Sequence, residues 1–355
     1  MKQNHEGFGI VRDSLFQLQN LKVLSLGFVK SQIGDIGISK IAVIISEQKL
    51  LSDLNLKIQN NQITEVGAQN LGQGFQHCKN LQNIKIEICN NLIKSQGTQE
   101  LINGMGFCQN TEYLTLDLRN NDIRSQRSIL QGISNFKNLK VFNLSLVNNY
   151  LNQDGACFLL DGLQQCSNLQ TFGLFIRNNN IEDNGSLEIC QQISQFKNLT
   201  HLTLELQNNS ITDDGCQSVG EKLKKCEKLK YLSLSLQNND VNEIGSLQLG
   251  RGLRQIVNLE ELILELSDNQ IGSQGASQLL SELALNQKLK IFNLGLRNCY
   301  MEEDHFDRFC YQLKHFQTLI SLEIELQENF ISEEGEIILI SRLKKLKRLV
   351  QFQLK

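Results

Sequence analysis

The sequence contains no proline among its 355 residues and no apolar run long enough to span a bilayer. Proline accumulates in long structureless linkers, so its absence argues against such linkers. The first ten residues, MKQNHEGFGI, lack the charged start and apolar run of a secretory signal. A formal net charge of -3 gives no indication of a nucleic acid or an anionic membrane as a partner. We therefore expect no nucleic-acid and no membrane partner.

Motifs of common catalytic and metal sites are also absent. The ten cysteines include no CxxC pair and no Cys/His spacing typical of zinc. No GxxxxGK[ST], HExxH, GxSxG or calcium-loop pattern occurs, and the five histidines are isolated. We expect no enzymatic activity, no cofactor and no metal. The cysteines are expected to be reduced core residues of a cytoplasmic protein.

What the chain does contain is one repeat that runs through its whole length. An apolar anchor recurs every 30 residues, with one step of 28 residues between Leu114 and Phe142. Only an internal repeat keeps such a register. The anchors are Leu24, Leu54, Ile84, Leu114, Phe142, Phe172, Leu202, Leu232, Leu262, Phe292, Leu322 and Phe352.

Each repeat predicts one strand followed by one helix. In HLTLELQNNSITDDG, residues 201–215, alternating leucines predict a short strand with one buried face. Val219, Leu223 and Cys226 then stand four and three residues apart, as on one helix face. Asp213 occupies the expected helix N-cap, and Gly215 is expected to allow close approach of a neighbour.

Two repeats depart from this pattern around the helix start. The 28-residue repeat lacks two residues there and has Arg127 in place of the glycine, which His305 replaces in a later repeat. A rebuilt loop is one interpretation of these positions, and a local kink or docking site is the other.

A single repeat buries too few side chains to offset the conformational entropy of ordering it, so the repeats must stack. The pattern resembles the leucine-rich repeats of the ribonuclease-inhibitor class, over essentially the whole chain. This resemblance implies an α/β fold: a right-handed solenoid, or horseshoe, of about 11–12 repeats of 30 residues, with a parallel sheet on the concave face and helices on the convex face. One extra L-x step is expected to lengthen or bulge the strand.

The resemblance also assigns a role to the asparagine that follows each strand. In the family its side-chain amide satisfies backbone groups where the strand turns away. Ser31 and Cys299 replace it in two repeats. The matching positions are Asn61, Asn91, Asn121, Asn149, Asn179, Asn209, Asn239, Asn269 and Asn329.

We expect one domain, residues 1–355. It begins with an N-terminal half-repeat at 1–23, continues with eleven full repeats at 24–351 and ends with a half-strand at 352–355. The helix positions expected in the N-terminal half-repeat are Gly7, Val11, Leu15, Leu18 and Leu21. Neither end has an obvious polar cap. Either partners cover the ends, or the chain is a piece of a longer protein.

Outward strand positions, at odd offsets from the anchors, should line the concave face. Aromatic, apolar and arginine residues gather there, as in interface anchors, although scattered apolar residues are also common on ordinary surfaces. The predicted partner-binding patch comprises Tyr113, Arg119, Val141, Val147, Phe175, Arg177, His201, Glu205 and Tyr231.

We therefore predict a non-catalytic protein–protein interaction scaffold that binds one or more protein partners within a larger assembly. Abundant glutamine and the resemblance favour a cytoskeletal or ciliary axoneme component. One alternative is a regulator of a small GTPase, because the activator of the Ran GTPase has about eleven similar repeats; its acidic tail is absent here. Another is an inhibitor resembling the ribonuclease inhibitor, which the mixed charge of the face disfavours.

Overall fold

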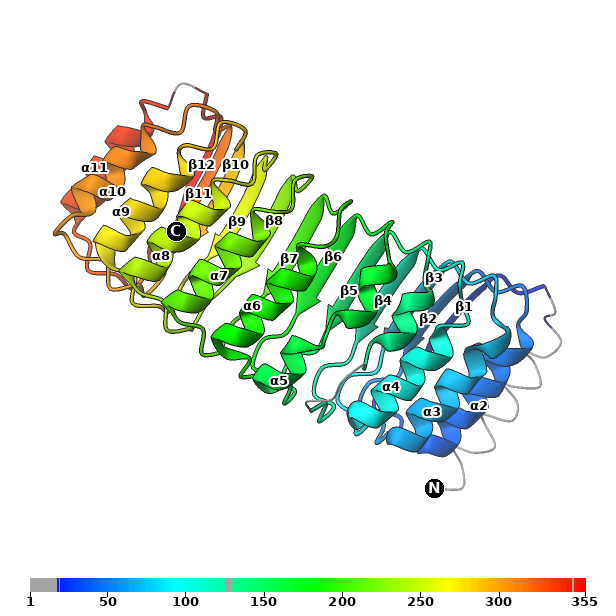
Figure 1. The fold of residues 1–355 in the computed structure, drawn as a ribbon. Coiled ribbons are helices and arrows are strands. Elements are labelled where there is room, and N and C mark those ends of the chain that lie inside the picture. Colours follow the sequence, from blue (N-terminus) through cyan, green and yellow to red (C-terminus); the bar gives the residue numbers. More distant parts are fainter. Residues whose placement is uncertain (1–17, 19, 125–128, 347) are drawn as a thin grey trace. The chain divides into compact units, whose positions relative to one another are not determined.

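The computed structural model describes residues 18, 20–124, 129–346 and 348–355 (Figure 1). The chain divides into two compact units, residues 1–179 (unit 1) and 180–355 (unit 2). Gly7, Val11, Leu15 and Arg127, which carried predictions above, lie outside the described residues. Leu18 and Leu21, which were also expected in a helix, are described and lie outside any helix.

Unit 1 is a parallel sheet whose strands follow chain order. The strands are β1 (Val23–Gly27), β2 (Asp53–Lys57), β3 (Asn83–Glu87), β4 (Tyr113–Asp117), β5 (Val141–Ser145) and β6 (Thr171–Phe175). The segments between them form α2 (Gly34–Glu47), α3 (Glu65–Gly74), η1 (Phe75–His77), α4 (Lys94–Met105), η2 (Gln131–Asn135), α5 (Asn152–Cys157) and η3 (Asp161–Gln165).

Unit 2 has the same plan. Its strands are β7 (His201–Glu205), β8 (Tyr231–Ser235), β9 (Glu261–Glu265), β10 (Ile291–Gly295), β11 (Ser321–Glu325) and β12 (Gln351–Leu354). Its helices are α6 (Glu182–Ile193), α7 (Asp213–Leu223), α8 (Glu243–Leu253), α9 (Gly272–Leu283), α10 (Phe306–Leu313) and α11 (Glu333–Leu343).

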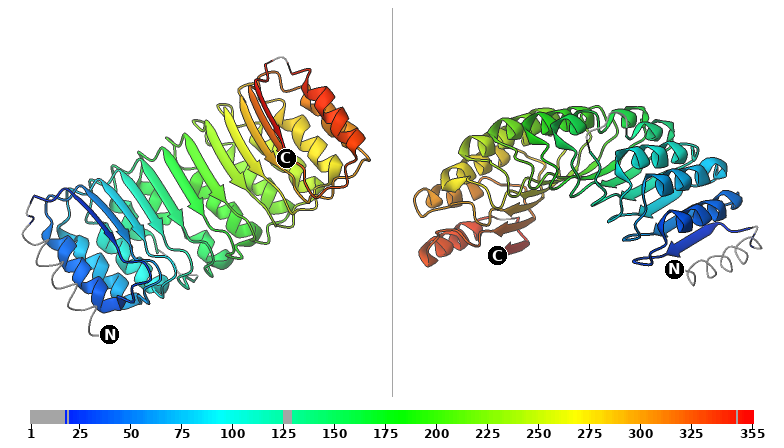
Figure 2. Two further views of the ribbon diagram at one scale, coloured as in Figure 1. Left: turned by 180° about the vertical axis from the view of Figure 1, so that it is seen from behind. Right: turned by 90° about the horizontal axis from the view of Figure 1, so that it is seen from below.

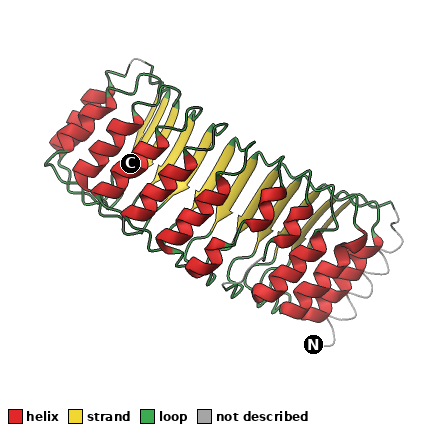
Figure 3. Cartoon of the chain, viewed as in Figure 1, coloured by secondary structure: helices red, strands yellow, loops and turns green. Residues whose placement is uncertain are grey.

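In each unit the helices cover one face of the sheet and leave the other face open (Figures 2 and 3). Leu202, Leu204 and Leu206 are fully buried, as are Val219 and Leu223 on the facing side of α7. The inward side chains of the strand, at every second residue, and those of the helix, at helical spacing, thus pack together in a single apolar layer. The predicted leucine-rich-repeat architecture, with a parallel sheet on one side and helices on the other, is confirmed in both units.

The outer segments of the 28-residue repeat and of the one after it differ from the longer α-helices of the other repeats. Within the described residues, the outer segment of the first is the 3₁₀ helix η2, and that of the second is the short α5 followed by η3. A 3₁₀ helix rises about 2.0 Å per residue against about 1.5 Å for an α-helix, so it spans a given distance with fewer residues. This suits a repeat that is two residues short.

The extra L-x step lengthens the strand and does not bulge it. The backbone N–H of Leu206 donates to the carbonyl of Ser235, and that of Asn208 donates to the carbonyl of Gln237. Donors at alternate residues continue the parallel ladder past the last residue of β7.

Two positions, both asparagine in most repeats, follow each strand and have different structural roles. The first, such as Asn90 (φ 56°), adopts the left-handed conformation that asparagine tolerates better than most residues. The second, Asn91, donates from Nδ2 to the carbonyl oxygens of Ile88 at 2.8 Å and of Ile58, in the preceding repeat, at 3.1 Å. Its Oδ1 accepts from the backbone N–H of Asn61 (2.9 Å) and of Ile63 (3.0 Å).

This arrangement recurs along both units, with local variation. The Oδ1 of Asn121 has no hydrogen-bond partner among the described residues. At Cys299 the thiol replaces the amide and donates to the carbonyl of Leu266 at 3.3 Å. Ser31 takes the place of the second asparagine in the first repeat, and its backbone N–H still donates to Oδ1 of Asn61 at 2.9 Å. Within each unit, the hydrogen bonds of this repeated asparagine position therefore link a repeat to the one before it.

The predicted N-cap at Asp213 is wrong by one residue. Thr212 caps α7, and Asp213 is the first helical residue. Its Oδ1 instead accepts from the backbone N–H of Asn242 in the next repeat, at 2.9 Å. Asp183 accepts in the same way from Thr212, at 2.7 Å, and a Cβ on Gly215 would lie 2.3 Å from this carboxylate. The repeated glycine thus makes room for the carboxylate of the preceding repeat.

His305, which stands in place of that glycine, has a φ of 72° and immediately precedes the shortened α10. This repeat therefore has a rebuilt loop on its outer side, which is the first of the two interpretations of the sequence.

Replacing Asn239 by alanine should lower the free energy of unfolding by about 3 kcal/mol, because buried backbone groups of two repeats lose their partners. Chemical denaturation measures this change, and hydrogen exchange should show faster exchange at Asn209 and Ile211. Asn238→Gly is the matched control. It should change stability by less than about 0.5 kcal/mol, because glycine accepts the φ of 50° at that position. Equal destabilisation by the two substitutions would contradict the role assigned to the second asparagine.

Candidate functional site

The open face of each sheet is where the structure exposes the most varied side chains. In the part of the chain that the structure describes, no helix is long and apolar enough to cross a membrane. Nor do three or more His, Cys, Asp or Glu side chains gather there in a way that could hold a metal ion. We therefore built the candidate site from the outward strand positions.

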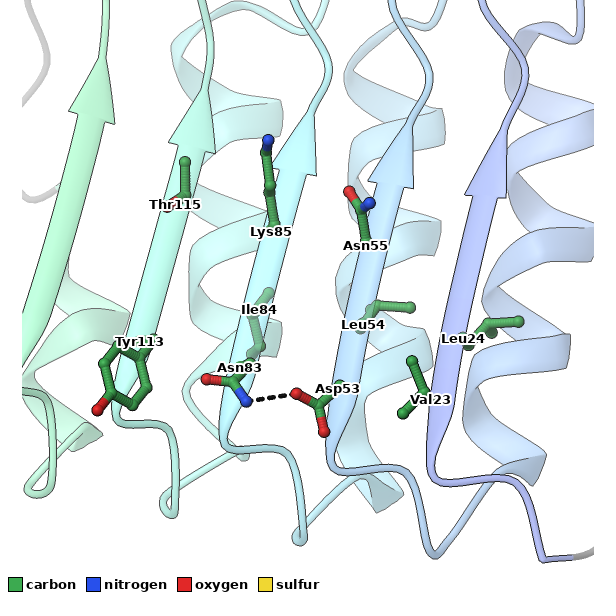
Figure 4. Close-up of a pocket in the computed structure, with 10 residues that line it drawn as sticks. All are labelled: Val23, Leu24, Asp53, Leu54, Asn55, Asn83, Ile84, Lys85, Tyr113 and Thr115. Carbon is green, nitrogen blue, oxygen red and sulfur yellow. Dashed lines mark hydrogen bonds between the residues drawn. The ribbon is translucent and has the colours of Figure 1, made fainter.

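A shallow depression of about 250 Å³ lies on the sheet face of unit 1, across β1 to β4 (Figure 4). Tyr113 lies at one side and Val23 at the other, and their exposed fractions are 46% and 62%. Both residues directly precede the buried anchor of their strand, so the alternation of the strand turns them outward. The lining residues are Val23, Leu24, Asp53, Leu54, Asn55, Asn83, Ile84, Lys85, Tyr113 and Thr115.

Some of the polar side chains between Tyr113 and Val23 form hydrogen bonds with neighbouring side chains. Asn83 donates a hydrogen bond to Asp53, and Asn55 donates to the hydroxyl of Ser25 at 3.3 Å. The Oδ1 atom of Asn55 is buried and has no partner among the described residues. The depression thus has paired polar groups and one buried, unpaired acceptor between two exposed apolar side chains.

The predicted patch falls into two groups within unit 1. Tyr113 and Val141 are paired in register where β4 and β5 begin. Beyond the other ends of the strands lie Arg119, Val147 and Arg177, at the same offset in consecutive repeats. Phe175 pairs with Ser145 in register and is half-buried. The middle of the strands, with Thr115, Asn143 and Gly173, separates the groups.

Arg119 is held by its own strand. Its Nε and Nη2 donate to the two carboxylate oxygens of Asp117, at 2.8 and 2.7 Å. This hydrogen bonding to Asp117 raises the pKa of the Arg119 guanidinium. An arginine fixed in this way presents a defined surface, although an exposed ion pair adds little stability by itself.

Cys89 lies beside this pair and is 5% exposed. Burial, followed by the negative charge of Asp117, raises the pKa of its thiol to about 11. A thiol with such a pKa is almost entirely protonated at neutral pH and is a poor nucleophile.

The remaining patch residues belong to unit 2. The rings of His201 and Tyr231 stack with their centroids 5.8 Å apart, on the neighbouring strands β7 and β8. The Nδ1 atom of His201 lies 2.9 Å from the hydroxyl of Thr200. Glu205 lies at the far end of β7 and is half-buried.

A family model described as "Leucine Rich repeat" matches residues 198–220 and 262–280. Together with the twelve-fold repeat and the strand–helix architecture of both units, this match decides the family. The chain is a leucine-rich repeat protein.

Among solved structures, this leucine-rich repeat protein is similar to internalin C2 from Listeria monocytogenes. The identity is 20% and the TM-score 0.41, and the match covers 72% of this chain and 84% of the internalin. It is also similar to actin-binding site 2 of leiomodin-1, with 17% identity, a TM-score of 0.35 and coverage of 46% and 87%. No curated protein matches it.

Much of the depression on this leucine-rich repeat protein lies outside the patch predicted from the sequence. Val23, Asp53 and Asn83 share the offset of Tyr113 and were not selected. They would have been identified by comparing the residue directly before the anchor in each of the consecutive repeats. The unpaired oxygen of Asn55 has no signal in the sequence, because it depends on where neighbouring side chains point.

Alkylation should test the protection of Cys89. At pH 8 only about one thiol in 1,000 is ionised when the pKa is about 11, so native protein should react slowly with iodoacetamide. Since the folded pKa is raised, the rate should climb about tenfold per pH unit between pH 8 and pH 10. Peptide mass spectrometry measures the rate, with Cys89 in denaturant as the reference. Native labelling at pH 8 as fast as in denaturant would contradict the assignment.

Proposed function

We propose that this leucine-rich repeat protein is a non-catalytic module that binds a protein partner through the open faces of its sheets. The observation that carries the proposal is the pair of exposed apolar side chains, Tyr113 and Val23, on either side of a polar depression. Large aromatic residues beside hydrogen-bonding groups are typical anchors of protein interfaces. Phe175 and the stacked His201 and Tyr231 extend the same kind of surface over other strands.

The form of the depression favours a macromolecular partner over a small ligand. Sites for small molecules are typically enclosed cavities of about 300–1,000 Å³ with mainly apolar walls. Here the volume is about 250 Å³, and Asp53, Asn55, Asn83 and Lys85 contribute polar groups to a lining that the sheet face presents directly. A protein side chain could fill this depression while the surrounding strands contact the rest of the partner.

The finer part of the proposal concerns the assembly. We propose a subunit of a cytoskeletal or ciliary axoneme scaffold. The glutamine-rich composition and the family resemblance support this role. Regulation of a small GTPase and inhibition of a ribonuclease are the competing roles.

Affinity purification from the source cell with the full chain as bait, followed by mass spectrometry, tests the binding role. Combining Tyr113→Ala with Phe175→Asp should reduce recovery of a specific partner at least about tenfold, since interface anchors account for most of the binding energy. Ile244→Ser, at an exposed position of α8, is the matched control and should leave recovery unchanged. Circular dichroism and the denaturation midpoint verify that each variant is folded.

The outcomes separate the roles. Recovery that is unchanged in the double variant would refute binding through this face of unit 1. Axonemal or other cytoskeletal proteins among the partners would support the scaffold. Faster phosphate release when purified GTPases are mixed with the chain would support the regulator, and suppression of ribonuclease activity would support the inhibitor.

A further inference from the structure

Charge is distributed differently on the sheet faces of the two units. The outward strand positions of unit 2 carry more acidic than basic side chains, whereas those of unit 1 carry both signs in nearly equal number. In unit 2 the acids are Glu205, Glu261, Glu265, Glu323 and Glu325, and the bases are Arg297 and Lys355. In unit 1 the acids are Asp53, Glu87 and Asp117, and the bases are Lys57, Lys85, Arg119 and Arg177.

Both basic side chains on the sheet face of unit 2 already form ion pairs. Each lies within ion-pair distance of two carboxylates, so neither neutralises the middle of the sheet. The pairs are Lys355 with Glu323 (2.5 Å) and Glu325 (2.9 Å), and Arg297 with Asp268 (2.9 Å) and Glu328 (2.7 Å).

Strand β9 keeps two carboxylates without a cation. Within the described part of unit 2, neither Glu261 nor Glu265 forms an ion pair. The carboxylate of Glu265 has a fixed position: Oε1 accepts from the backbone N–H of Ser267 at 3.0 Å, and a Cβ on Gly295 would lie 2.1 Å from Oε2. A carboxylate offers about four acceptor sites, so most of this capacity is available to a ligand.

A second observation points to the same place. Ser235 pairs in register with Glu265 and turns to the same face. This serine is only 7% exposed, and its Oγ has no hydrogen-bond partner among the residues that the structure describes. Buried hydroxyl groups in proteins are usually satisfied, so this unpaired group beside Glu265 points to a missing hydrogen-bond partner at this place.

Apolar side chains surround the two carboxylates. Ile263 lies between them on β9, because outward positions alternate along the strand. Glu261 is flanked in register by Tyr231 and Ile291. The strand therefore presents an acidic, an apolar and a second acidic side chain in line, with further apolar surface beside the first.

We propose that the β8–β10 face of unit 2 binds an extended, basic segment of a protein partner. The segment has arginine or lysine at positions i and i+4 and an apolar residue at i+2. Over four residues an extended chain rises about 13 Å, so such a segment along β9 places its cations at Glu261 and Glu265 and its apolar side chain at Ile263. Complementary charge sets the register and favours this segment over acidic ones. This inference rests on the proposed protein-binding role.

Fluorescence anisotropy with the full chain tests the proposal. The probe is a fluorescein-labelled synthetic peptide containing RSLSR, and the comparison peptide contains SRLRS, with the same composition but with arginines and leucine on opposite faces. RSLSR should bind at least about fivefold more tightly at low salt, and its binding should weaken several-fold between about 50 and 300 mM salt. A peptide containing ESLSE should not bind.

Two double variants locate the site. E261Q/E265Q should weaken RSLSR binding at least about tenfold, whereas E323Q/E325Q, at carboxylates already paired with Lys355, should change it less than about twofold. Equal binding of the two arginine peptides, no binding at about 1 mM, or indifference to E261Q/E265Q would overturn the inference. If a native partner is lost in the Tyr113/Phe175 variant while RSLSR fails to bind, the proposed function stands and this inference fails.

Discussion

The side-chain amide of the repeated asparagine is the interaction on which the rest of this structure depends. At Asn91 a single side chain satisfies carbonyl oxygens of two consecutive repeats and accepts two backbone N–H groups of the earlier one. The chain can therefore turn away from each strand inside the protein without leaving buried backbone groups unpaired. Because three of these four partners belong to the neighbouring repeat, no repeat can complete its own hydrogen bonding alone.

This dependence fixes how the functional surface is built. Strands of each unit pair without offset, anchor against anchor, as Leu232 pairs with Leu262. Residues with equal offsets then form rows about 4.8 Å apart across the open face. A substitution at one outward position changes one place in a row and leaves the scaffold intact, so binding groups can vary more freely than the buried anchors and asparagines.

The sequence predicts the strands and the apolar layer well, because both follow from strict spacing. It fails where two residue types compete for one task. Thr212 and Asp213 are both good N-cap residues, and only contact with the next repeat gives the cap to the threonine and a bridging role to the aspartate. The 3₁₀ helix η2 also escapes prediction, since the shorter length of its repeat and not its residue types favours it. At the site, outward positions such as Tyr113 are predictable, whereas the unpaired oxygen of Asn55 depends on side-chain orientation.

The same reasoning explains why charge totals for the whole chain are a poor guide to its partners. Counted together, acids and bases nearly cancel, but a ligand on a repeat surface contacts only a few rows. Lys355 forms ion pairs with both Glu323 and Glu325, so these charges largely neutralise each other. Where Glu265 lies beside a glycine and a serine, no long side chain at these two positions can reach back to neutralise it. Small neighbours leave the carboxylate available, and so a chain with little net charge can still discriminate between partners through a single strand.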